Sequence, residues 1–223
     1  MATTVEATSK QPTAATGAAT PATPWYRDRA RQLVAGSVGV GLIALVAWSV
    51  VVSGQRKERF AARSLEKASE AAEAGNLPLA SSELQKLIQT YKGTDAATEA
   101  VITLNQVRMV NEQSELAAVG LRDFLATKPA PRYAAPAAGL LGAALENSKR
   151  WADAGDAYAQ ASQAADVDYL KARYLLDAGR AYTLAGNTER GAEAYRLILQ
   201  KYPKSSSFTE AQVRLAELTR GKM

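Results

Sequence analysis

Small and hydrophobic residues recur at helical spacing from residue 57 onward, in short segments separated by Gly, Asn and Pro. This spacing is typical of amphipathic α-helices with one apolar face. The pattern also repeats, since a small residue returns every 37 positions, at Ala80, Ala117, Ala154 and Gly191. Two further series keep the same step: Leu84, Leu121, Tyr158, Tyr195 and Leu87, Phe124, Ala161, Ile198. Four copies in one register predict an array of helical units.

Each predicted unit consists of two antiparallel helices joined by a short turn, Gly75-Asn76 in the first unit and Gly186-Asn187 in the fourth. A single unit cannot bury its apolar face, whereas stacked units bury a continuous core. We therefore expect an all-α solenoid of about four helix pairs within a repeat domain of residues 56–223. The predicted units are 61–94, 98–131, 135–168 and 172–205, followed by a capping helix over 206–218. An irregular helical bundle is the alternative, because alanine-rich sequences match small-residue templates easily.

Ahead of the repeats the chain changes character twice. Residues 1–24 are rich in Ala, Thr and Pro and have too little apolar bulk to offset the entropy of ordering, so this tail is predicted to be disordered. Residues 25–55 then include 24 residues without a charge, 32–55, which as a helix exceed a ~30 Å hydrocarbon core. We predict a single transmembrane helix. A cleaved signal peptide is the alternative, although its apolar core is shorter, about 7–15 residues.

Small residues four positions apart lie within the predicted span, Ala35 with Gly39 and Ser37 with Gly41. Such pairs let a second membrane helix approach closely, so these four residues are predicted helix contacts. The alternative is that Gly and Ala are simply common in spans. Three basic residues flank each end of the span, so the positive-inside rule leaves its orientation open.

The composition removes most catalytic chemistry. The 223 residues include no Cys and no His, which excludes thiolate and imidazole metal sites, disulfides, Cys nucleophiles and His acid–base catalysis. The aspartates near residues 151–168 lack EF-hand spacing. The net charge of +5 splits unevenly, with +2 in residues 1–31 and +3 spread over the long mixed-charge remainder, and we find no basic stripe with interleaved aromatics of the kind nucleic acid needs. We expect a non-enzyme with no catalytic residue, no metal, no cofactor, no small-molecule substrate and no nucleic-acid partner.

The repeat positions resemble the tetratricopeptide repeat. The fourth unit carries Ala178, Gly179, Tyr182, Gly191, Tyr195 and Pro203 at the motif positions, and the third carries Leu141, Gly142, Leu145, Ala154 and Tyr158, with Asp166 where Pro is usual. The first two units are degenerate, with Lys67 and Arg108 where large apolar residues are usual. The resemblance implies that the first helix of each unit lines a groove for protein partners. By register, the groove residues are Glu99, Gln106, Met109, Glu146, Asn147, Arg173 and Arg180. The two arginines are suited to grip a carboxylate or an acidic segment.

The order of tail, span and repeat domain resembles the YfgM-like family of bacterial ancillary translocon subunits. This resemblance implies a single-pass inner-membrane protein with a cytoplasmic N-terminus and a periplasmic repeat domain. It further implies a scaffold that assists protein export or chaperone hand-off at the translocon. The alternative is an accessory structural subunit of another large inner-membrane complex, docked through its span and its repeat domain.

Overall fold

A computed structural model describes the backbone of residues 25–219 and, in the helix that begins at Trp25, the side chains of residues 45, 47–49 and 51 onward. The predicted tail, 1–24, lies outside the described residues. The predicted helix contacts Ala35, Ser37, Gly39 and Gly41 fall on side chains that are not described, and so does most of the predicted span, which stays a prediction. The chain divides into two compact units, Met1–Val51 and Val52–Met223. Among the described residues, no helix combines the length and apolar character needed to cross a membrane.

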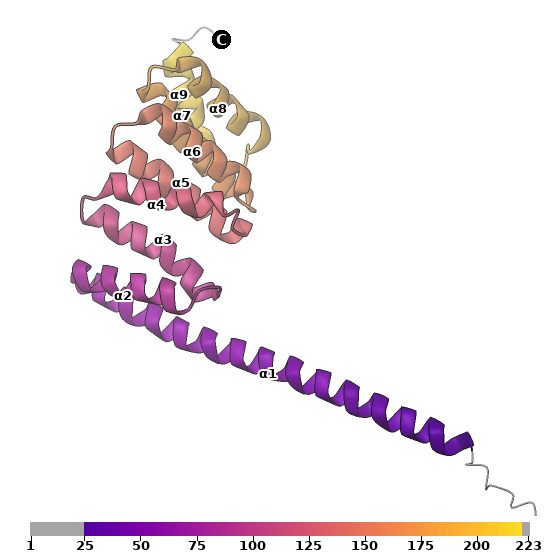
Figure 1. Ribbon diagram of the computed structural model, residues 1–223. Coiled ribbons are helices and arrows are strands. Elements are labelled where there is room, and N and C mark those ends of the chain that lie inside the picture. The colour runs from indigo at the N-terminus through magenta and orange to yellow at the C-terminus, as the bar shows by residue number, and fades with distance from the viewer. Residues whose placement is uncertain (1–24, 220–223) are drawn as a thin grey trace, which may run out of the picture. The chain divides into compact units, whose positions relative to one another are not determined.

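Residues 25–219 contain only α-helices and the turns between them, which confirms the all-α prediction for this part of the chain. The helices are α1 (Trp25–Glu73), α2 (Leu77–Thr90), α3 (Asp95–Val110), α4 (Ser114–Ala126), α5 (Pro131–Asn147), α6 (Trp151–Ala164), α7 (Asp168–Leu184), α8 (Thr188–Lys201) and α9 (Phe208–Thr219). The helix α1 begins in the first compact unit and ends in the second. Within the second unit the helices stack as successive antiparallel pairs (Figure 1).

The 37-residue period is visible in the helix boundaries. The second helices of the four pairs begin at Leu77, Ser114, Trp151 and Thr188, each 37 residues after the last. From α2 to α9 each helix packs on its neighbours in sequence, and α3 also packs on α5, as α7 does on α9. The first helices of the second and third pairs are therefore in contact, and the first helix of the fourth pair contacts α9, so the helices form a solenoid rather than an irregular bundle.

The core is arranged along the stack in three clusters of buried side chains. One cluster joins the end of α1 to α2 and α3, and includes Leu84 and Leu87. The central cluster runs from α3 to α7 and includes Leu121 and Tyr158. The third joins α7, α8 and α9 and includes Tyr195. Because α3 and α7 each contribute to two clusters, every helix pair shares core with the next.

Small residues of the first helices make room for large residues of the second. A Cβ on Gly142 would lie 2.6 Å from Cε1 of Tyr158, so the ring occupies the space that a side chain would need. Gly179 bears the same relation to Tyr195, 37 residues further on. At the equivalent positions of the first pair, Ala68 accompanies the smaller Leu84. Glycine is therefore found where the partner is tyrosine, because only a bare helix backbone leaves room for the ring.

The second pair replaces this arrangement with a polar one, which explains Arg108. Its Nη1 donates to Oδ1 of Asn105 at 3.0 Å, and the Nδ2 of Asn105 donates to the Val101 carbonyl at 2.8 Å. Both side chains lie against Gly120, where a Cβ would be 2.7 Å from the Asn105 Oδ1. Asn105 is only 1% exposed, and each of its polar groups is bonded, so the burial costs little.

Candidate functional site

A connected group of polar side chains joins α5, α6 and α7. The Glu146 Oε2 accepts a hydrogen bond from the Tyr158 hydroxyl at 2.9 Å and an ion-paired bond from Arg180 Nη2 at 3.1 Å. Arg180 also lies 3.5 Å from Oδ1 of Asp177, whose Oδ2 accepts from Nε of Arg173 at 3.2 Å. We call these five residues the α5–α7 polar network. It brings together three of the predicted groove residues, Glu146, Arg173 and Arg180.

The two acids of this network are largely buried, whereas its arginines are half exposed. The side chains of Glu146 and Asp177 are 15% and 17% exposed, against 50% for Arg180. Burial, followed by the charge of Glu146 and the hydrogen bond to it, raises the pKa of Tyr158, so its hydroxyl stays protonated and donates. The arginines are thus held by carboxylates beneath them and present their remaining N–H groups at the surface.

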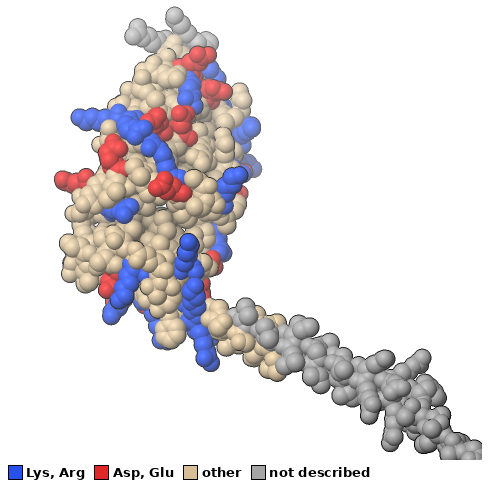
Figure 2. All heavy atoms as spheres, in the orientation of Figure 1, with Lys and Arg blue, Asp and Glu red and all other residues tan. Residues whose placement is uncertain are grey.

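A small hollow borders the network at the C-terminal end of the stack. It has a volume of ≈ 170 Å³ and is lined by Arg173, Leu176, Asp177, Arg180, Tyr195, Glu210 and Arg214. The third arginine comes from α9 and lies 3.6 Å from Glu210. Each of the three arginines therefore has a carboxylate partner, so an acidic ligand must compete with Asp177, Glu146 or Glu210 for them. Figure 2 shows acidic and basic side chains interleaved over this half of the domain.

The other predicted groove residues lie elsewhere on the first helices. Met109 and Asn147 line a hollow beside the α3–α4 turn, where Nδ2 of Asn147 is 3.3 Å from Oγ of Ser114. Gln106 lines a different hollow, between the end of α1, α2 and α3. Glu99 is exposed near the start of α3 and lines none of the hollows described. The structure therefore distributes the seven residues over separate surfaces and does not gather them around one ligand.

One cluster was not anticipated from the sequence. Tyr182 donates from its hydroxyl to Oδ1 of Asp156 at 2.9 Å, and Arg190 pairs with the same oxygen at 2.5 Å. The guanidinium of Arg190 also lies 4.0 Å from the centre of the Tyr182 ring. Burial, with the hydrogen bond to Asp156, raises the pKa of Tyr182. The cluster ties α6, α7 and α8 together. Tyr182 stands at a repeat-motif position, but Asp156 and Arg190 do not recur at the 37-residue step, so the periodicity did not indicate the cluster.

The arrangement of these groups suits recognition of polar surfaces. Among the described residues, no three acidic side chains converge as ligands for a metal ion. The hollows are open and lined by helix surfaces, and the Tyr182 hydroxyl beside one of them donates to Asp156. Paired arginines offer directional N–H donors to carboxylates or backbone carbonyls of a partner.

Comparison with solved structures identifies the fold. One similar structure is the crystal structure of MamA protein, with a TM-score of 0.57 and 18% sequence identity, covering 73% of this chain and 82% of that one. Another is a putative kinesin light chain with nearly identical TPR-like repeats from Podosopora anserina, with a TM-score of 0.56 and 15% identity, covering 74% and 87%. The fold is a tetratricopeptide-like helical repeat. No protein-family model and no curated protein matches the sequence.

Both helices of a pair contribute to the core and to the polar surface. In the third and fourth pairs, Leu145 and Tyr182 of the first helices pack in the same core cluster as Tyr158 of a second helix. The structural similarity establishes the architecture of the repeat domain. Because the sequence identity is below 20%, it establishes the architecture alone.

Proposed function

We propose that this chain is a protein-interaction scaffold that is held at a membrane by residues 32–55. The observation that carries the proposal is the α5–α7 polar network. Four of its five residues lie on first helices of a tetratricopeptide-like stack, and its arginines present N–H groups at the surface. A stack of this kind offers a long surface built from successive repeats, which suits an extended or folded protein partner. On this proposal the protein performs no catalytic step and holds no cofactor.

The location we propose is the bacterial inner membrane. The order of parts supports it: a 24-residue uncharged segment precedes the repeat domain, as in the YfgM-like subunits that the layout resembles. The N-terminus would then be cytoplasmic and the repeat domain periplasmic. The scaffold would bind proteins that leave the export channel, or the chaperones that receive them. A single uncharged segment of this length is sufficient to anchor such a domain.

A second candidate function is favoured by the ion pairing of the arginines. Asp177 and Glu146 already pair with Arg173 and Arg180, so a client in a groove shares these arginines with the two carboxylates and meets a largely neutralised charge. A partner that docks flush on the repeat domain does not depend on those charges, and the scattered hollows suit several separate contacts. The chain would then be an accessory structural subunit of another large inner-membrane complex.

The first experiment is a gentle detergent purification of the tagged full-length chain, followed by a native gel and mass spectrometry of the co-purifying proteins. Export-channel components and periplasmic chaperones would support the export scaffold. A stoichiometric set of other integral membrane proteins would replace it with the accessory subunit. Recovery of the chain alone under conditions that preserve membrane complexes would contradict both.

The second experiment removes the charges of the polar network. The double variant Arg173→Gln and Arg180→Gln should lose a client bound at this surface, because it removes the exposed donors. Glutamine is preferred to glutamate, since an added carboxylate beside Glu146 and Asp177 would also destabilise the fold. The matched control is Arg122→Gln with Arg196→Gln, two exposed arginines on second helices. Equal loss of partner from both double variants would show that the network is not the binding surface.

A further inference from the structure

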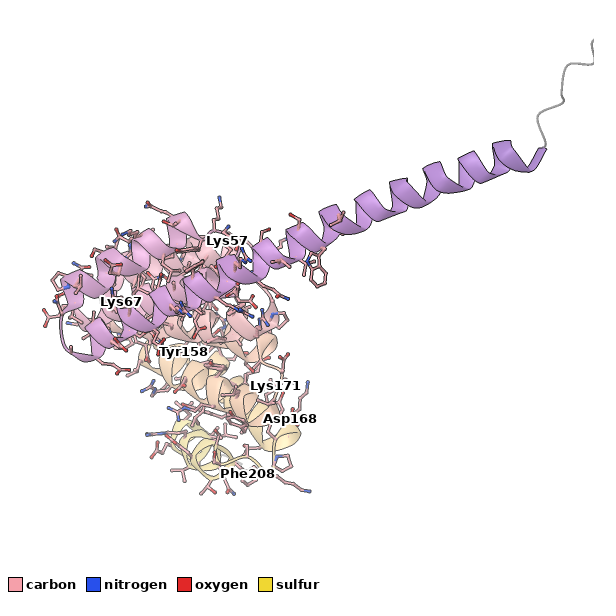
Figure 3. All side chains as sticks on the ribbon, turned by 90° about the horizontal axis from the view of Figure 1, so that it is seen from below. Lys57, Lys67, Tyr158, Asp168, Lys171 and Phe208 are labelled. Atoms are coloured by element: carbon pink, nitrogen blue, oxygen red, sulfur yellow. The ribbon has the colours of Figure 1, made fainter. Side chains whose placement is uncertain are left out.

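The end of α1 that packs on the repeat domain carries a row of basic side chains. Arg56, Arg59, Arg63 and Lys67 are spaced three, four and four residues apart, so they share one face of the helix, and all four are exposed. We call these four residues the α1 basic stripe. Lys67 is labelled in Figure 3, along with Lys57 nearer the start of the stripe. Figure 2 shows Lys and Arg side chains gathered at this end of the domain, around α1 and α2.

The acid that interrupts the stripe in sequence does not neutralise it in space. Glu58 turns instead to the start of α3, where its two carboxylate oxygens accept the backbone N–H groups of Asp95 and Ala96, each at 2.9 Å. A carboxylate at a helix N-terminus is stabilised by the unpaired N–H groups and the helix dipole. The sequence Arg56-Lys57-Glu58-Arg59 does not indicate this interaction with α3. From the sequence alone, Glu58 would be expected to neutralise part of the basic charge beside it.

The stripe also has no ion-pair partner within the described part of the chain. Glu66 and Glu70 follow on the same helix, but neither forms an ion pair with Arg63 or Lys67. The neighbouring Lys57 donates to the Lys92 carbonyl at 2.7 Å, which leaves a further positive charge beside the stripe. This end of the domain thus differs from the α5–α7 polar network, where every arginine has a carboxylate partner.

An exposed aromatic ring lies within the stripe. Phe60 is 55% exposed, and it lies four residues after Arg56 and three before Arg63, on the same side of the helix. Guanidinium groups bind phosphates bidentately, and three of the four stripe residues are arginines. Basic residues interleaved with an exposed aromatic are typical of helix surfaces that contact the headgroups and upper acyl chains of a bilayer.

We propose that the α1 basic stripe binds the phosphate groups of anionic phospholipids and so holds the first repeat close to the membrane surface. The proposal rests on the membrane anchoring proposed above, because the stripe begins directly after the uncharged segment 32–55. That continuity favours a bilayer over an acidic protein as the partner. The attraction is electrostatic and falls off within a Debye length, about 10 Å at 0.1 M salt, so the cations nearest the uncharged segment, Arg56 and Arg59, contribute most.

The test uses the full-length chain in lipid nanodiscs, with a fluorescent label at the stripe. The chain has no cysteine, so the substitution Ala62→Cys, at an exposed position beside Arg63, gives a single labelling site. Quenching by the neutral reagent acrylamide reports how far the label is shielded from water. We expect quenching to be about twofold weaker in discs with roughly a third phosphatidylglycerol than in pure phosphatidylcholine, and about 1 M NaCl should remove the difference.

Two charge-matched variants make the test specific. Replacing the four stripe residues by glutamine should abolish the difference between the two lipids. The control replaces four exposed basic residues elsewhere and should retain it: Arg122→Gln, Lys149→Gln, Arg196→Gln and Lys204→Gln. Equal quenching in both lipids for the otherwise unsubstituted chain would overturn the proposal. Loss of a co-purifying acidic protein from the stripe variant, with no lipid dependence of quenching, would also overturn it and assign the stripe to that protein.

Failure of the anchor is measured separately. Flotation of the full-length chain with pure phosphatidylcholine vesicles in about 1 M NaCl depends on the apolar segment alone, since salt screens the stripe. If the chain floats under this condition but its quenching does not depend on the lipid, the apolar segment anchors it and the stripe does not contact the headgroups. A chain that floats only with anionic vesicles at low salt has the headgroup contact without the anchor, which would overturn the proposed function and retain the stripe.

Discussion

At the scale of single residues, the turns inside the four helix pairs share one backbone conformation but not one residue type. The positions 37 apart, Gly75, Glu112, Lys149 and Gly186, have φ of 78°, 60°, 59° and 77°. In the outer two turns the next residue is an asparagine whose side chain caps the following helix, whereas Gln113 and Arg150 make no such bond. The inner two turns therefore lack both the glycine and the cap that this conformation favours.

The substitution Glu112→Gly together with Gln113→Asn should stabilise the domain by about 1–2 kcal/mol. A non-glycine residue in the left-handed region costs about 1 kcal/mol, and an asparagine N-cap contributes about as much. Glu112 is exposed, and its side chain makes no hydrogen bond or ion pair in the described structure, so no such interaction is lost with it. Urea unfolding followed by circular dichroism measures the change. The reverse experiment, Gly75→Ala, should destabilise by about 1 kcal/mol, and a gain there would contradict the argument.

The packing of Tyr195 on Gly179 gives a second prediction at this scale. Gly179→Ala should destabilise the domain by about 1–3 kcal/mol, because the new methyl group overlaps a ring that is only 2% exposed and cannot move aside. The loss should exceed the gain in helix propensity, which is about 1 kcal/mol. In a background of Tyr195→Leu, the residue found at the equivalent Leu84 and Leu121, the cost of the methyl should fall. Additivity of the two substitutions within about 0.5 kcal/mol would show that ring and glycine are not coupled.

At the scale of helices, tyrosine hydroxyls join neighbouring elements and make the stability depend on pH. Burial is the main cause that raises the pKa of Tyr158 and Tyr182, and their acceptors Glu146 and Asp156 add to it. An unfolded tyrosine ionises near pH 10, so the folded state binds these protons where the unfolded state has released them. This stabilisation is complete below about pH 10 and is lost as the pH rises from there toward the folded pKa values.

The double variant Tyr158→Phe and Tyr182→Phe tests this linkage. Above about pH 10 the free energy of unfolding of the parent should fall by about 1.4 kcal/mol per pH unit for each tyrosine, in addition to any loss from other groups. The free energy of unfolding of the variant should fall less steeply with pH, because two of the titrating groups have been removed. At about pH 8 the variant should be slightly less stable, by about 1 kcal/mol for each hydrogen bond removed. If the free energy of unfolding of the two proteins falls with the same slope between about pH 10 and 11, these hydroxyls do not contribute to the pH dependence of stability.

The helices and their core residues could be predicted from sequence because packing leaves a periodic trace. The small and large series at Ala80 and Leu84 recur at a fixed step, and buried positions at that step can only come from repeated units. The α5–α7 polar network could not be predicted in the same way. Glu146 and Arg180 are 34 residues apart, not 37, and their contact depends on how far one first helix is displaced along the next. The predicted groove residues lie on α3, α5 and α7, those that line a hollow are divided among different hollows, and whether they bind a partner stays a prediction.

Side chains at opposite ends of a helix cannot share a hollow, which is why the predicted groove separates. Glu99 lies in the second turn of α3, and Met109 lies in its last turn, beside the α3–α4 loop. At 1.5 Å per residue their backbones are about 15 Å apart along the axis. The sequence also placed Glu58 among basic residues, whereas the fold brings it to the start of α3. Contacts between units therefore decide both the surface and its charge.

At the scale of the whole repeat domain, three core clusters in a row imply that the two ends can open separately. The core cluster at the N-terminal end and the core cluster at the C-terminal end share no residue. They are connected only through the central cluster, which shares α3 with the first and α7 with the second. In a stack of this kind stability is approximately the sum of unit stabilities and of interfaces between neighbours. Local opening at one end then costs less free energy than unfolding of the domain.

Two leucine truncations at opposite ends test this independence. Leu84 in α2 is fully buried and Leu215 in α9 is 4% exposed, so each change to alanine should remove about 2–5 kcal/mol from its own cluster. In native-state hydrogen exchange, Leu84→Ala should lower protection in α2 and α3 and leave α8 and α9 unchanged. Leu215→Ala should do the reverse, and α5 and α6 should remain the most protected in both. Equal loss of protection along all helices would show that the domain opens as one cooperative unit.

The two proposed functions require different stability at the ends of the repeat domain. A docking subunit is stabilised at its docked end by the complex, whereas a free scaffold must keep both ends folded without a partner.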